Sequence, residues 1–183
     1  MSIVRNTYFR VILYTLLLSL IVRIVFFGIS IALNIGPRSD HFYLTQSTDL
    51  SDESLAGISL YQNIHNDSFI QKYGSGRNDR NNSLFDYYQL EDGIVVATQL
   101  QDDKIIRISI GLNSNPSLAT AKGIFPGDSI EVVEKKYGKN YYERVEQGID
   151  IRGYVDKQNH RTIEFWHWNG NVQQIRYDID EME

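Results

Sequence analysis

The chain has 183 residues, no cysteine and a formal net charge of −5 at pH 7. A chain without cysteine has no disulfide, no thiol nucleophile, no cysteine-ligated zinc and no lipid attached through a cysteine. The acidic balance argues against nucleic acid as a partner, because that binding is dominated by cationic contacts to phosphate.

The first predicted element is a transmembrane helix over residues 11–33, preceded by a cytoplasmic segment at residues 1–10. At about 1.5 Å per residue, the helix is long enough to cross roughly 30 Å of hydrocarbon. Arg23 is the charged residue within it, and a central arginine costs about 2.5–3.5 kcal/mol of insertion free energy. Each surrounding Leu, Ile, Val or Phe returns about 0.3–0.6 kcal/mol, so insertion remains favourable.

The charges that flank this helix predict its orientation. Arg5 and Arg10 precede it, whereas the chain after residue 34 has 15 basic and 23 acidic residues. By the positive-inside rule, the N-terminus is expected in the cytoplasm and the remainder outside it, in a single-pass protein of the cell membrane. A cleaved secretory signal is the alternative, with Ser30-Ile31-Ala32 as a small-x-small cleavage site.

The part of the chain after the helix is predicted to consist of a tether and two repeats. Residues 34–56 are polar and contain Pro37, which indicates a tether with little structure of its own. Residues 57–115 and residues 116–183 are predicted to form a first and a second α/β repeat. Each repeat is small, so the two together are expected to rely on their own apolar core.

The division into repeats depends on two short motifs that recur in the same order. Gly57-Ile58 and Lys72-Tyr73-Gly74 occur in the first copy, and Gly123-Ile124 and Lys136-Tyr137-Gly138 occur in the second. In both copies a helical stretch lies between the motifs, and strand-like runs follow a polar turn. A duplicated unit is the economical explanation for this recurrence.

The strand-like runs alternate with period two, which indicates half-buried antiparallel strands. In residues 149–155, Ile151 and Val155 are expected to face inward, with Arg152 and Tyr154 on the opposite side. The predicted fold class is therefore α+β. An N-terminal transmembrane helix is followed by a duplicated helix-plus-antiparallel-strands unit, with the helices on one face of the sheet.

The second copy resembles a known small α/β unit. The run Thr120-Ala121-Lys122-Gly123-Ile124, continued by Gly127-Asp128-Ser129, resembles the repeat of β-lactamase inhibitor proteins and of the SmpA/OmlA (BamE-like) outer-membrane assembly lipoproteins. The resemblance covers residues 123–180 best and residues 57–110 weakly. It implies helices on one sheet face and an open, aromatic-rich face that binds protein. The lipidated cysteine of the lipoproteins is missing here, and the helical span takes its place.

The strand expected at residues 161–168 carries the candidate binding site. If Ile163 and Phe165 face the core, then Glu164 and the two tryptophans share the other face. Trp, Tyr and Arg are the common energetic anchors of protein interfaces. The alternative is that another part of the chain covers this face and makes the tryptophans core residues. The predicted binding residues are Trp166, Trp168, Glu164, Tyr154, Arg152 and Arg176.

The predicted function is a non-enzymatic, membrane-anchored binding protein outside the cytoplasm, with an inhibitory, immunity or envelope-assembly role toward another protein. No catalytic motif or metal-ligand spacing is recognised, so no catalytic residue, cofactor or metal is predicted. Two alternatives stay open. One is an accessory or sensor subunit that docks on another membrane protein through Arg23. The other is an envelope hydrolase, which requires a cleft that gathers His167 with two or more acids.

Overall fold

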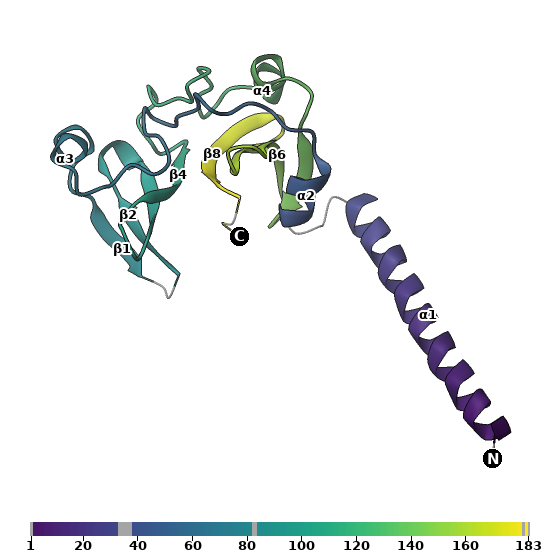
Figure 1. Cartoon of the computed structure of the whole chain (residues 1–183). Coiled ribbons are helices and arrows are strands. Elements are labelled where there is room, and N and C mark those ends of the chain that lie inside the picture. Colours follow the sequence, from purple (N-terminus) through teal and green to yellow (C-terminus); the bar gives the residue numbers. More distant parts are fainter. Residues whose placement is uncertain (1, 33–37, 82–83, 181, 183) are drawn as a thin grey trace. The chain divides into compact units, whose positions relative to one another are not determined.

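The computed structural model describes residues 2–32, 38–81, 84–180 and 182. The chain divides into two compact units, Met1–Pro37 and Arg38–Glu183. The first unit consists of one long helix, and the second contains the strands and the remaining helices (Figure 1).

The first unit contains helix α1 (Ser2–Ala32), which confirms the predicted apolar helix near the N-terminus. Its stretch Arg10–Ile29 has a mean hydropathy of 2.4, and in the described part of the chain it is the one helix long and apolar enough to cross a membrane. The side chains of this stretch are exposed, as expected for a helix that lies outside a protein core. Such a helix is compatible with a membrane anchor or with a signal sequence.

The second unit is built on one antiparallel sheet. Within the described residues, eight strands are arranged in the order β1-β2-β3-β4-β8-β7-β6-β5. The strand bounds are Arg77–Asn81 (β1), Phe85–Gln89 (β2), Val95–Gln99 (β3), Ile105–Gly111 (β4), Tyr142–Glu146 (β5), Ile149–Asp156 (β6), Arg161–Trp168 (β7) and Asn171–Ile179 (β8).

Helix α3 (Asp67–Tyr73) precedes β1–β4, and helix α4 (Ile130–Tyr137) precedes β5–β8 (Figure 1). A short 3-10 helix lies at Glu91–Gly93, between β2 and β3. The order of one helix followed by four strands therefore occurs twice. The α+β fold class with a large antiparallel sheet is confirmed. Duplication as the origin of the arrangement stays a prediction.

Helices α3 and α4 pack into one continuous hydrophobic cluster on one face of the sheet. Phe69 and Tyr73 enter this cluster from α3, and Val133 and Tyr137 enter it from α4. The Tyr137 ring lies 5.1 Å from the ring of Phe165, which is fully buried on β7. Burial of these large side chains, at about 25 cal/mol per Å² of apolar area, is the main force that holds the helices on the sheet.

Residues 38–56 are part of the folded unit, so the prediction of an unstructured tether is wrong for this segment. Helix α2 (Arg38–Leu44) places Phe42 against Tyr142 and Val155 in a second apolar cluster. After α2, the chain runs beside β6, where the amide of Thr48 donates to the carbonyl of Val155 at 2.7 Å. Leu50 and Leu55 are buried in the main core. Residues 34–37 of the predicted tether lie outside the described residues.

The sides assigned to the strand at residues 149–155 are reversed in the structure. Ile151 pairs with Trp166, so both lie on the sheet face opposite α4. Tyr154 pairs with Ile163 and lies on the helix face. The prediction was wrong because both faces of β6 are buried from Ile151 to Asp156. On such a strand, alternation does not show which face meets which layer.

Candidate functional site

The sheet face opposite α3 and α4 brings together charged side chains from distant parts of the chain. It is called the open face here, although α2 covers part of it through Arg38, His41 and Phe42. The register places Glu164 beside Arg176 on β8 and beside Gly153 on β6. Gly153 in turn lies beside Tyr142 on β5. These residues form one row across four strands, and Ile151, Trp166 and Gln174 form the next row.

Glu164 is the centre of a buried arginine–carboxylate cluster. Its side chain is 0% exposed and accepts hydrogen bonds from Arg144 at 3.0 and 3.2 Å. Arg176 and the hydroxyl of Tyr142 also donate to it. The Nε of Arg38 lies 3.6 Å from the same carboxylate. The first turn of α2 and the strands β5 and β8 thus converge on one acid.

Asp178 is the second fully buried acid of the cluster. It accepts a bond from Arg107 Nε at 2.8 Å, and Arg38 of α2 contacts both of its oxygens. Arg38 and Arg107 also donate to the carbonyl of Met182. Arg38 therefore binds α2 and the C-terminal segment to the centre of the sheet. The arginine–carboxylate cluster consists of Arg38, Arg107, Arg144, Arg176, Glu164 and Asp178.

The row depends on a glycine at position 153. A Cβ atom built there would lie 2.1 Å from Cζ of Tyr142, far inside contact distance. Because Gly153 has no side chain, the Tyr142 ring crosses β6 and its hydroxyl reaches Glu164. His41 of α2 stacks on the same ring, with centroids 5.0 Å apart. The glycine thus makes room for the contact between α2 and the cluster.

The arginines keep Glu164 ionised. Burial alone would raise its pKa, but attraction to Arg38, Arg176 and Arg144 outweighs burial and lowers the pKa of Glu164 to about 2. At neutral pH the carboxylate carries no proton to donate, and its lone pairs are occupied by four donors. It is suited to fixing the positions of its neighbours rather than to acid–base chemistry.

The low pKa of Glu164 predicts that the free energy of unfolding falls as the solution is made acidic. The stabilisation is fully present above the ordinary pKa of 4.5 and is lost as the pH falls toward about 2. The shift corresponds to about 3 kcal/mol. Urea unfolding of the wild type between these pH values should therefore show a steeper loss of stability than unfolding of Glu164→Gln. Equal pH dependence of the two proteins would contradict the assignment.

Trp166 packs on the arginine–carboxylate cluster and is half-buried. Its indole Nε1 donates to Glu164 at 3.3 Å. The guanidinium carbons of Arg144 and Arg176 lie 5.7 and 5.0 Å from the ring centre, within the range of cation–π contacts. Trp168, two residues further on β7, is 55% exposed. The open face therefore presents one fixed and one projecting tryptophan.

The structure brings together only part of the predicted site. Glu164, Trp166 and Arg176 are in direct contact on the open face. The expectation that Tyr154 and Arg152 share this face is wrong. Tyr154 is buried on the helix face, 5.2 Å from the ring of Tyr137, and Arg152 pairs there with two glutamates, Glu134 and Glu143.

Sequence reasoning predicted Glu164 and Arg176 but missed the other members of the cluster, Tyr142, Arg144, Asp178 and Arg38. Tyr142 and Arg144 alternate with Glu143 and Val145, which is a strand signal for β5. Asp178 and Arg176 are two residues apart on β8, which places them on one face. Arg38 gave no signal, because its partners lie more than a hundred residues away.

The geometry around His167 does not favour a hydrolase. Burial lowers its pKa, and its Nδ1 is buried without a hydrogen-bond partner among the described residues. A catalytic histidine is normally oriented by such a partner. Within the described part of the chain, no group of three or more His, Cys, Asp or Glu side chains is placed to hold a metal ion.

No protein-family model and no characterised relative matches the chain. Two solved structures are similar to it. One is an extracellular protein containing an SCP domain from Bacillus anthracis, with 10% identity and a TM-score of 0.44, over 67% of this chain and 44% of that one. The chain thus spans less than half the length of that protein.

The other is a putative beta-lactamase inhibitor protein from Streptococcus mutans, with 18% identity and a TM-score of 0.23, over 69% of this chain and 92% of that one. This protein bears the name of one of the families that the second copy resembles, whereas the BamE-like resemblance stays a prediction. With TM-scores below 0.5, neither similarity carries an argument about function.

Proposed function

We propose that this chain is a non-enzymatic, membrane-anchored protein that binds another protein outside the cytoplasm through the open face around Trp166 and Trp168. The observation that carries the proposal is the fixed position of Trp166. Two arginines flank its ring, and both are bound to a carboxylate that is fully buried. An anchor that is already ordered loses little conformational entropy on binding, which favours affinity.

The chemistry of the site supports binding over catalysis. The acid at the centre, Glu164, is ionised and saturated with donors. Arg144 and Arg176 form ion pairs with this acid and cation–π contacts with the Trp166 ring. Tryptophan and arginine at the centre of a patch are the residue types that contribute most to protein interfaces.

Replacing the two tryptophans tests the proposal. Trp166→Ala is expected to weaken binding of the partner by at least about 30-fold, because central aromatic anchors contribute about 2 kcal/mol or more. Trp168→Ala removes only the projecting side chain and is expected to have a smaller effect. Val132→Ala, on the helix face, is the matched control. The measurement is the dissociation constant of the full-length protein in detergent, with unfolding midpoints to confirm folding. Unchanged binding by folded Trp166→Ala would overturn the proposal.

The membrane part of the proposal places residues 1–10 in the cytoplasm and keeps α1 uncleaved. The length and hydropathy of Arg10–Ile29 support an anchor. An uncleaved anchor predicts a mature protein of 21.2 kDa that stays with the membrane in alkaline carbonate. A shorter, extractable protein would show that the helix is a cleaved signal.

A second candidate function is supported by Arg23, which lies within the apolar stretch of α1. An arginine at this depth is costly unless it pairs with a group inside the membrane or reaches the interface. Docking on another membrane protein through Arg23 predicts that co-purification survives deletion of residues 57–183 and is lost in Arg23→Leu. Retention of the partner by Arg23→Leu would exclude this function.

A further inference from the structure

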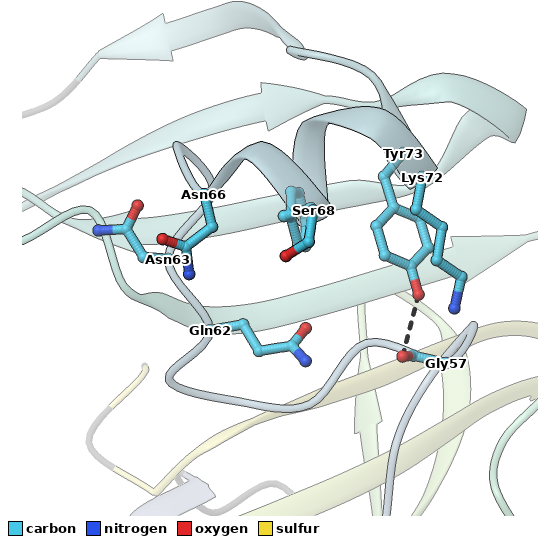
Figure 2. A pocket seen from close by; sticks show the side chains of 8 residues that line it. Gly57, Gln62, Asn63, Asn66, Ser68, Lys72 and Tyr73 are labelled. Atoms are coloured by element: carbon cyan, nitrogen blue, oxygen red, sulfur yellow. Dashed lines mark hydrogen bonds between the residues drawn. The ribbon is translucent and has the colours of Figure 1, made fainter.

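A second candidate site lies on the other half of the sheet, beside α3. It is a pocket with a volume of about 260 Å³ between α3 and the segment that leads into it (Figure 2). This volume lies just below the range of about 300–1,000 Å³ that is typical of pockets for drug-sized molecules, so it suits a smaller ligand. The pocket is lined by Gly57, Gln62, Asn63, Asn66, Ser68, Phe69, Lys72 and Tyr73.

Asn63 and Tyr73, two of the lining residues, make hydrogen bonds that hold the sides of the pocket in position. The amide nitrogen of Asn63 donates to the carbonyl of Asp102 at 2.8 Å, and its oxygen accepts from the amide of His65 at 2.8 Å. The hydroxyl of Tyr73 donates to the carbonyl of Gly57 at 3.0 Å (Figure 2). These bonds tie the segment before α3 to the helix and to the β3–β4 turn, so the pocket is preformed.

Three other lining side chains have hydrogen-bonding capacity to spare. The side chains of Gln62, Asn66 and Ser68 are exposed to solvent and have no hydrogen-bond partner among the described residues, and Figure 2 shows them around the same opening as Lys72. Each amide or hydroxyl group is both donor and acceptor. Such a set matches the hydroxyl groups of a sugar ring, which are also donors and acceptors at once.

Lys72 adds one positive charge to this set. Its ammonium lies 4.9 Å from the centre of the Tyr73 ring, and no carboxylate occurs among the residues that line the pocket. A ligand carboxylate would gain a charge-assisted hydrogen bond here, which is stronger than a neutral one. We infer that this pocket binds a single sugar ring that carries one carboxylate. The site is independent of the Trp166 face.

The test uses the full-length protein in a phosphocholine detergent, because detergents with sugar head groups would compete. Methyl glucuronide and methyl glucoside are the probes, and ligand-observed NMR titration gives both dissociation constants. The glucuronide is expected to bind about tenfold more tightly than the glucoside, and Lys72→Met is expected to remove that difference. Ser68→Trp, at an exposed position of α3, is expected to fill the pocket and abolish binding of both sugars.

Gln101→Ala, at an exposed position in the β3–β4 turn, is the matched control and is expected to bind both sugars as the wild type does. Unfolding midpoints of all variants establish that they are folded. Absence of binding to the wild type at about 10 mM sugar, a very weak affinity, would overturn the inference. Equal binding of the two sugars, or binding that persists in Ser68→Trp, would also overturn it.

Discussion

Glu164→Leu is expected to destabilise the folded unit by about 3–5 kcal/mol, the range found when one partner of a buried ion pair is removed. Glu164 is 0% exposed, and its loss leaves Arg144, Arg176 and Arg38 facing a side chain that accepts no hydrogen bond. Each of these guanidinium groups keeps a second acid, Asp178 or Glu146, but loses the ion pair with Glu164 that offsets part of the cost of its burial. A domain of ordinary stability, about 5–15 kcal/mol, would lose a large fraction of it.

Urea unfolding followed by tryptophan fluorescence measures this loss of unfolding free energy. The signal comes from the region of the cluster, because both tryptophans of the chain lie on the open face. Glu146→Gln is the matched control. Glu146 also pairs with Arg144, but its side chain is 38% exposed, so its loss is expected to cost less than about 1 kcal/mol. If Glu164→Leu and Glu146→Gln had equal midpoints, the cluster would have no special part in stability.

A fragment that begins at residue 57 is expected not to fold, whereas a fragment that begins at residue 38 is expected to fold. The segment between these positions buries Phe42, Leu50 and Leu55. Three such side chains contribute roughly 5–9 kcal/mol by burial of apolar area. That amount is comparable with the whole stability of an ordinary domain. The loss of Arg38 adds to it, because Asp178 would keep fewer of its partners.

Near-UV circular dichroism and urea unfolding of the two fragments provide the measurement. Fragment 38–183 should show a fixed aromatic environment and a cooperative transition, and fragment 57–183 should show neither. Arg38→Ala in the longer fragment separates the ion pairs from the apolar packing and is expected to have an intermediate effect. Cooperative unfolding of both fragments at the same urea concentration would show that residues 38–56 are an accessory segment.

Local patterns were sufficient for the apolar helix and for the strand that carries the site. Glu164 and Trp166 alternate with Ile163 and Phe165, and alternation on a single strand requires no knowledge of the neighbouring strands. The recurrence of short motifs was likewise sufficient to place α3 and α4, since each helix ends at the tyrosine of a Lys-Tyr-Gly motif. The α+β class followed from these elements.

The cluster could not be predicted, because its members meet only through long-range packing. Arg38 contacts Asp178 although 140 residues separate them, and only the placement of α2 brings them together. On β6, Arg152 and Tyr154 have polar atoms but long apolar parts, so residue type did not reveal that they point toward the helices. The apolar residues of the segment after α1 follow no period, which made a packed segment resemble a tether.

Site-specific photocrosslinking tests the central claim most directly, namely that the open face around Trp166 is where a partner protein binds. A photoreactive side chain is placed at position 168 on the open face, or at position 132 on α4, in the full-length protein in its native membranes. The structure predicts a discrete protein adduct from position 168 that disappears with Trp166→Ala, and no such adduct from position 132. Adducts of the same size from both positions, or an adduct from position 132 alone, would contradict the account.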